Sequence, residues 1–143
     1  MYGPFAWYKW VAVFRDWPIF AEGFLTTIIV SLLGLALALA LGIIFGVLGA
    51  AQWKWAKMIN RVYVEFIQNT PLVIQVFFLF HALPHLGIML PVFTVGVLGV
   101  GIYHGAYIAE VIRAGIQSIR RGQMEAALSQ VGYDAWSATY WVE

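Results

Sequence analysis

The chain has 143 residues, of which 62% are hydrophobic, 17% aromatic and 10% charged, and its formal net charge at pH 7 is +1. Soluble domains carry about 25% charged residues and disordered chains are poor in apolar residues, so this composition excludes both classes. The near-neutral charge indicates no nucleic-acid partner, and the absence of cysteine excludes disulfides and thiolate metal sites. The composition predicts an all-α integral membrane protein with one membrane domain.

Residues 1–23 are expected to lie at the outer membrane interface. Two basic and two acidic side chains interrupt any apolar stretch here, so we expect no cleavable signal peptide. Trp and Tyr are enriched at membrane–water interfaces, and this segment is rich in both. The aromatic side chains expected in this belt are Tyr2, Phe5, Trp7, Tyr8, Trp10, Phe14 and Trp17.

The first spanning helix is predicted at residues 24–51. Residues 23–53 carry no charge, and a spanning helix needs roughly 20 apolar residues. Small side chains recur every four residues along this helix, which lets another helix approach closely. This stripe predicts packing inside the protein's own bundle or, alternatively, against a second subunit. Its members are Gly34, Ala38, Gly42, Gly46 and Ala50.

Two further spans are predicted at residues 59–83 and 92–114. Residues 66–109 also carry no charge, and this stretch is too long for a single helix. Pro84 and Pro91 lie within it and indicate a turn between two helices.

The second predicted span contains polar residues and Pro71, which removes a backbone donor and crowds the preceding turn. The span is therefore expected to be kinked or broken at membrane depth. Broken helices line the substrate path in many transporters, although the polar residues could instead satisfy one another in a structural seam. The candidate substrate-path residues are Gln68, Asn69, Thr70, Gln75, Tyr107 and Glu110.

Glu110 lies near the inner end of the third predicted span, three residues before Arg113. An (i, i+3) ion pair accounts for both residues, and a proton or cation site is the alternative. His81 and His85 have the spacing of some metal pairs, but Pro84 separates them, so we predict a solvated pair and no metal site. No phosphate-binding glycine loop or nucleophile–base arrangement is present, and no cofactor is expected.

The basic side chains predict the orientation in the membrane. The first span is followed by Lys54, Lys57 and Arg61. Arg113 lies at the end of the third span, which is followed by Arg120 and Arg121. Two spans separate these segments, so both lie on one side, which by the positive-inside rule is the cytoplasm. The N-terminus is therefore expected outside.

A short amphipathic helix is predicted at residues 122–132, after the third span. Met124, Ala127, Leu128 and Val131 follow the helical i, i+3, i+4, i+7 spacing, and Gly132 suits the C-terminal end. The apolar face could pack on the protein's own bundle or enter a groove on a partner.

This segment resembles the E-A-A…G signature of ABC importer permeases, with Glu125-Ala126-Ala127 followed by Gly132. Two further stretches are similar to the polar-amino-acid branch of that family. The first is Tyr63-Val64-Glu65-Phe66 with Asn69-Thr70-Pro71, and the second is residues 105–119 with Gly122-Gln123. The resemblance covers residues 20–142. It implies a type I ABC importer permease-like helical bundle of about three transmembrane helices plus a cytoplasmic coupling helix. The residues that it implies for coupling to the ATPase are Gly122, Gln123, Glu125, Ala126, Ala127, Leu128 and Gly132.

The resemblance also implies the function. It predicts a permease subunit, itself not an enzyme, that imports a polar amino acid across the bacterial cytoplasmic (inner) membrane. The implied partners are a cytoplasmic ABC ATPase, a second permease subunit that is the same or a sibling, an extracytoplasmic solute-binding protein and membrane lipid. Family members continue past the signature with further spans, so the resemblance implies a C-terminally truncated permease. The alternatives are a non-transporting membrane fragment or assembly subunit, and a small channel lined by Gln68 and Gln75.

Overall fold

The computed structural model describes residues 3, 7–119, 122, 123, 126 and 129. Throughout this part of the chain the regular structure is helical. The elements are α1 (Trp7–Arg15), α2 (Trp17–Ala50), α3 (Lys54–Gln68), α4 (Leu72–Phe77), the π-helix η1 (Phe78–Ala82), the 3₁₀ helix η2 (Leu83–Leu86) and α5 (Val92–Gln117).

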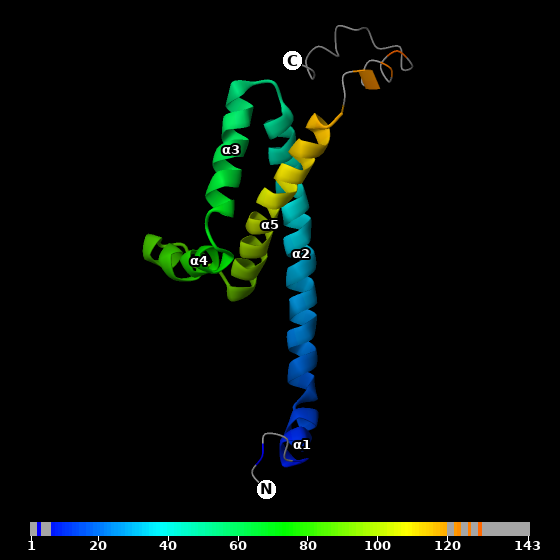
Figure 1. Ribbon diagram of the computed structural model, residues 1–143. Coiled ribbons are helices and arrows are strands. Elements are labelled where there is room, and N and C mark those ends of the chain that lie inside the picture. The colour runs from blue at the N-terminus through cyan, green and yellow to red at the C-terminus, as the bar shows by residue number, and fades with distance from the viewer. Residues whose placement is uncertain (1–2, 4–6, 120–121, 124–125, 127–128, 130–143) are drawn as a thin grey trace.

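Two long helices form the core of the fold. With 34 and 26 residues, α2 and α5 are about 51 Å and 39 Å long at 1.5 Å per residue. Both are long and apolar enough to cross a membrane. Figure 1 shows α5 lying along the C-terminal part of α2, whereas the N-terminal part of α2 extends beyond α5 to α1. α2 contains residues 24–50 of the span predicted at 24–51, and α5 contains the whole span predicted at 92–114.

Small residues allow α2 and α5 to approach each other closely. A Cβ at Gly34 would lie 2.9 Å from Val100 Cγ1, and a Cβ at Gly101 would lie 2.5 Å from Leu37 Cδ2. Ala38 is completely buried. Helices associate in lipid mainly through such packing. The interpretation of the small-residue stripe as packing within the bundle is therefore confirmed.

α3 packs beside the C-terminal half of α2 and the facing part of α5 (Figure 1). Tyr63 connects the three helices, because its ring stacks on Phe45 of α2 at 4.1 Å and its hydroxyl donates to the carbonyl of Ile102 in α5 at 2.8 Å. This contact fixes the polar face of α3 opposite α5.

The helix break predicted at Pro71 is confirmed. α3 ends at Gln68, and the helical segment that starts at Leu72 is bent by 95° from it. Figure 1 shows α4 lying across the direction of α3. The 59–83 region is thus two segments, which form either one broken span or a re-entrant loop, so the described residues contain two candidate spans, or three if the bent pair counts as one.

Side chains around the break satisfy its backbone. Gln75 Nε2 donates to the carbonyls of Ile67 and Thr70 at 3.1 and 2.9 Å. Asn69 Nδ2 donates to the carbonyl of Glu65, and Thr70 Oγ1 to that of Phe66. The carbonyls of Glu65 and Ile67 also accept backbone N–H groups, so the side chains matter most for those of Phe66 and Thr70. Unpaired carbonyls are costly inside a membrane, and these bonds therefore stabilise the break.

The segment predicted as a coupling helix lies mostly outside the described residues. Four of its residues are described, and each has helical backbone and is exposed. They are Gly122, Gln123, Ala126 and Ser129. The other predicted coupling residues, Glu125, Ala127, Leu128 and Gly132, lie outside the described part of the chain, as do Tyr2 and Phe5 of the predicted aromatic belt.

Candidate functional site

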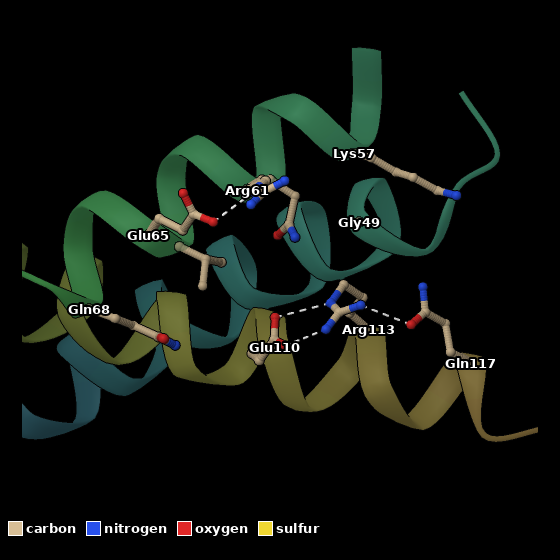
Figure 2. Close-up of a pocket in the computed structure, with 10 residues that line it drawn as sticks. Gly49, Lys57, Arg61, Glu65, Gln68, Glu110, Arg113 and Gln117 are labelled. Carbon is tan, nitrogen blue, oxygen red and sulfur yellow. Dashed lines mark hydrogen bonds and ion pairs between the residues drawn. The ribbon is translucent and has the colours of Figure 1, made fainter. Parts of the chain in front are cut away.

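A polar cavity of about 590 Å³ lies between α3 and α5, beside the C-terminal end of α2 (Figure 2). Polar and charged side chains dominate its wall. The lining residues are Gly49, Lys57, Asn60, Arg61, Val64, Glu65, Gln68, Glu110, Arg113 and Gln117.

The α3 wall of the cavity carries one ion pair and one further cation. Arg61 Nε donates to Glu65 Oε1 at 2.7 Å, one helical turn apart. Lys57 lies one turn before Arg61 on the same helix, and it forms no ion pair among the described residues. Figure 2 shows Lys57 and Gln68 near opposite ends of this wall.

The α5 wall carries a second ion pair. Arg113 Nε donates to Glu110 Oε2 at 3.0 Å, Arg113 Nη2 pairs with Glu110 Oε1, and Arg113 Nη1 donates to Gln117 Oε1 at 2.8 Å. The (i, i+3) pair predicted from the sequence is therefore confirmed. Because both carboxylate oxygens of Glu110 bind Arg113, the charge of this acid is balanced within its own helix.

Asn60 is a buried polar residue at the wall of the cavity. Its side chain is 4% exposed, and its Oδ1 has no hydrogen-bond partner among the described residues. Gly49 of α2 lies directly against it, since a Cβ there would come within 2.5 Å of Asn60 Nδ2. A buried acceptor without a donor is costly, so this atom offers a binding position for a donor.

The predicted substrate-path residues fall into three groups. Gln68 and Glu110 line the polar cavity from its two opposing walls. Asn69, Thr70 and Gln75 lie at the break, where their side chains bind backbone carbonyls. Tyr107 lies elsewhere on α5, with its hydroxyl 3.2 Å from that of Tyr103.

The two histidines near the turn lie away from this cavity. His81 lines a separate apolar hollow of about 370 Å³ between α4, η1 and the start of α5, and its ring lies 4.3 Å from that of Phe77. His85 is exposed in η2. Within the described residues no three metal-ligand side chains gather.

Of the ten lining residues, sequence reasoning named only Gln68 and Glu110 as candidates for the site. Those that it missed are Gly49, Lys57, Asn60, Arg61, Val64, Glu65, Arg113 and Gln117. The signal for Asn60 was available, because the polar lining residues of α3 recur with helical spacing. They are Lys57, Asn60, Arg61, Glu65 and Gln68. Gly49 falls outside the four-residue stripe of α2, and only its contact with Asn60 and Arg113 reveals its role.

Membrane-length helices in a bundle, with a broken segment and a polar cavity beside it, define the class of polytopic α-helical membrane proteins. The chain belongs to the family described as "Binding-protein-dependent transport system inner membrane component", whose family model matches residues 38–130.

Similar proteins agree with this assignment. The chain is 44% identical over 112 residues to the probable amino-acid ABC transporter permease protein y4tG of Sinorhizobium fredii, an alignment that covers 78% of this chain and 48% of that protein. It is 39% identical over 117 residues to the probable glutamine ABC transporter permease protein GlnM of Bacillus subtilis, covering 82% and 54%. It is 34% identical over 137 residues to the glutamine transport system permease protein GlnP of Escherichia coli K12, covering 94% and 62%.

A solved structure has the same fold. The match is to the crystal structure of an amino acid ABC transporter with histidines, with a TM-score of 0.76 and 30% identity, and it covers 92% of this chain and 61% of that one. The chain thus spans about half to three fifths of the length of the relatives it matches.

Proposed function

We propose that the chain supplies membrane-spanning helices to an ABC importer of polar amino acids. The observation that carries the proposal is the family match over residues 38–130, together with the fold shared with an amino acid ABC transporter. Relatives named as glutamine permeases make glutamine the first substrate to test. ATP hydrolysis would take place in a cytoplasmic partner subunit, and a solute-binding protein outside would deliver the amino acid.

The proposed orientation has the N-terminus outside and the basic end of the bundle in the cytoplasm. Lys54, Lys57 and Arg61 of α3 and Arg113 of α5 all lie at the end of the fold where α2 terminates. Cytoplasmic flanks of spanning helices carry an excess of Lys and Arg, which supports this orientation. The segment 122–132 would then face the cytoplasm and contact the ATPase.

The substrate path is proposed to pass the polar cavity. Gln68 and Glu110 lie on its opposing walls, and both ion pairs form within single helices. α3 and α5 can therefore separate or approach without breaking a charge pair, so the cavity can open on one side during transport. Asn69, Thr70 and Gln75 would support this path by maintaining the break rather than by binding the amino acid.

Uptake by the assembled transporter tests the proposal. Proteoliposomes containing this chain with its companion permease, ATPase and binding protein should accumulate radiolabelled glutamine when ATP is enclosed with the ATPase. The control is the same preparation with a non-hydrolysable ATP analogue, and valine serves as the apolar comparison. If ATP drives no uptake of any polar amino acid, the proposal is wrong and a non-transporting assembly role is favoured.

A further inference from the structure

We propose that the basic end of the polar cavity binds the headgroup of an anionic phospholipid that carries a free hydroxyl, such as phosphatidylglycerol. The inference rests on the proposed orientation, which places this end of α3 in the cytoplasmic leaflet. It does not depend on which amino acid is carried.

The charge of the cavity favours an anion. Three basic and two acidic side chains line it, and each acid is already paired within its own helix. Lys57 is exposed and has no ion-pair partner in the described part of the chain. A phosphate would balance this remaining charge, and basic pockets between membrane helices on the cytoplasmic side bind anionic headgroups.

The surroundings of Lys57 favour a lipid over a soluble anion. Lys57 is preceded by Trp53, the residue before α3, and by Trp55 in the first turn of α3, and these residues are 76% and 75% exposed. Exposed Trp side chains in membrane proteins lie at the level of the lipid headgroups. Lys57 is therefore held at the depth where a phospholipid carries its phosphate.

Asn60 should make the site prefer those anionic lipids whose headgroup carries a hydroxyl. It lies one helical turn from Lys57, and its buried Oδ1 lacks a donor among the described residues. A headgroup hydroxyl can donate to this oxygen while the phosphate binds Lys57. A phosphate ester without a hydroxyl can satisfy only the lysine, so it should bind more weakly.

Native mass spectrometry of the purified full chain in detergent tests the proposal. The chain is titrated with dioleoyl phosphatidylglycerol, phosphatidylcholine or phosphatidylmethanol, which has the same charge as phosphatidylglycerol but no headgroup hydroxyl. Phosphatidylglycerol should bind tightest. Lys57→Gln should weaken its binding about fivefold, which corresponds to about 1 kcal/mol for one lysine near a headgroup. Lys9→Gln, the same change on α1 far from the cavity, should have no effect.

Each outcome supports or overturns the proposal. Equal binding of phosphatidylglycerol and phosphatidylcholine, or equal effects of the two lysine variants, overturns it. Displacement of the lipid by an equal concentration of glycerol 1-phosphate would identify a site for soluble phosphate esters instead. Asn60→Ala should remove the preference for phosphatidylglycerol over phosphatidylmethanol. If this variant fails to fold, the wild-type chain still tests that preference, because equal binding of the two lipids would contradict it. Transport is not measured, so failure of uptake and failure of lipid binding are distinguishable.

Discussion

Gly49 of α2 and Asn60 of α3 are in such close contact that α2 has no room for a side chain at this position. A Cβ at Gly49 would lie 2.5 Å from Asn60 Nδ2, 2.8 Å from Asn60 Cγ and 2.9 Å from Arg113 Cδ. Gly49 therefore sets the position of one residue from each wall of the cavity. The contact couples the packing of α2 to the spacing between α3 and α5.

Gly49→Ala should destabilise the fold by about 1–3 kcal/mol, because the added methyl group must displace the buried amide of Asn60. Unfolding in a detergent titration measures the loss. Gly23→Ala is the matched control, since it lies in the same helix and a Cβ there meets no atom within 4 Å. Helix propensity favours alanine at both positions, so equal stabilisation of the two variants would contradict the contact.

Gly46→Ala should weaken the packing of α2 on α5. Its Cβ would lie 2.9 Å from the carbonyl oxygen of Ala109, which is helix backbone and cannot rotate away, and 2.8 Å from Ile112 Cβ. We expect a loss of about 1–3 kcal/mol and a lower yield of inserted protein. The control is Gly115→Ala in α5, where a Cβ meets nothing within 4 Å. A Gly46 variant as stable as this control would show that α2 and α5 are not held at this distance.

Pattern reasoning could predict those features that depend on local sequence. The absence of charge predicted the membrane helices, Pro71 predicted the break, and the three-residue spacing of Glu110 and Arg113 predicted their ion pair. Each depends on residues within one or two helical turns. The small-residue stripe likewise indicated close packing, because helices in lipid associate through small residues.

The features that were missed depend on contacts between helices. No local pattern predicts the 95° bend between α3 and α4, because the direction of the chain after a break depends on packing, here of Val76 against Gly99 of α5. The packing of α3 against α5 also brings Gln68 and Glu110 to one cavity and leaves Gln75 and Tyr107 outside its wall. A local pattern cannot predict this arrangement. Gln75 was expected on a substrate path, yet its amide nitrogen is used by two backbone carbonyls.

Gln75→Leu should therefore act on stability. The carbonyl of Ile67 still accepts the backbone N–H of Thr70, but the carbonyl of Thr70 loses the one donor that it has among the described residues. An unsatisfied buried group costs about 1–3 kcal/mol. Detergent unfolding measures this cost. Thr27→Val is the control, because Thr27 Oγ1 donates at 2.8 Å to the Gly23 carbonyl inside the continuous helix α2, where that bond is dispensable. Equal losses in the two variants would contradict the special role of Gln75.

Cysteine labelling should place the two ends of the broken segment on opposite sides of the membrane. The chain has no native cysteine, and both Trp55 and His85 are exposed. A membrane-impermeant maleimide should label Trp55→Cys only from the cytoplasmic side and His85→Cys only from outside. Labelling of both from the same side would show that α3, α4 and the turns after them form a re-entrant loop, and the proposed topology would be wrong.

Ala127→Asp should release the ATPase from the assembled transporter. In the predicted amphipathic helix at residues 122–132, Met124, Ala127, Leu128 and Val131 share one face. A face of this size stabilises a complex by only a few kcal/mol, at about 25 cal/mol per Å² of apolar surface, so one buried charge is enough to break it. Co-purification of the ATPase with the permease from detergent-solubilised membranes is the measurement, with membrane insertion followed separately.

Ser129→Asp is the matched control for this variant. Ser129 is exposed, and helical spacing places it opposite the apolar face of the same segment. The same charge introduced there should leave ATPase binding unchanged, because it remains in water when the partner docks. If both variants release the ATPase, the effect is one of charge on the segment as a whole. If Ala127→Asp retains it at the wild-type level, the apolar face packs on the permease's own bundle and the ATPase binds elsewhere.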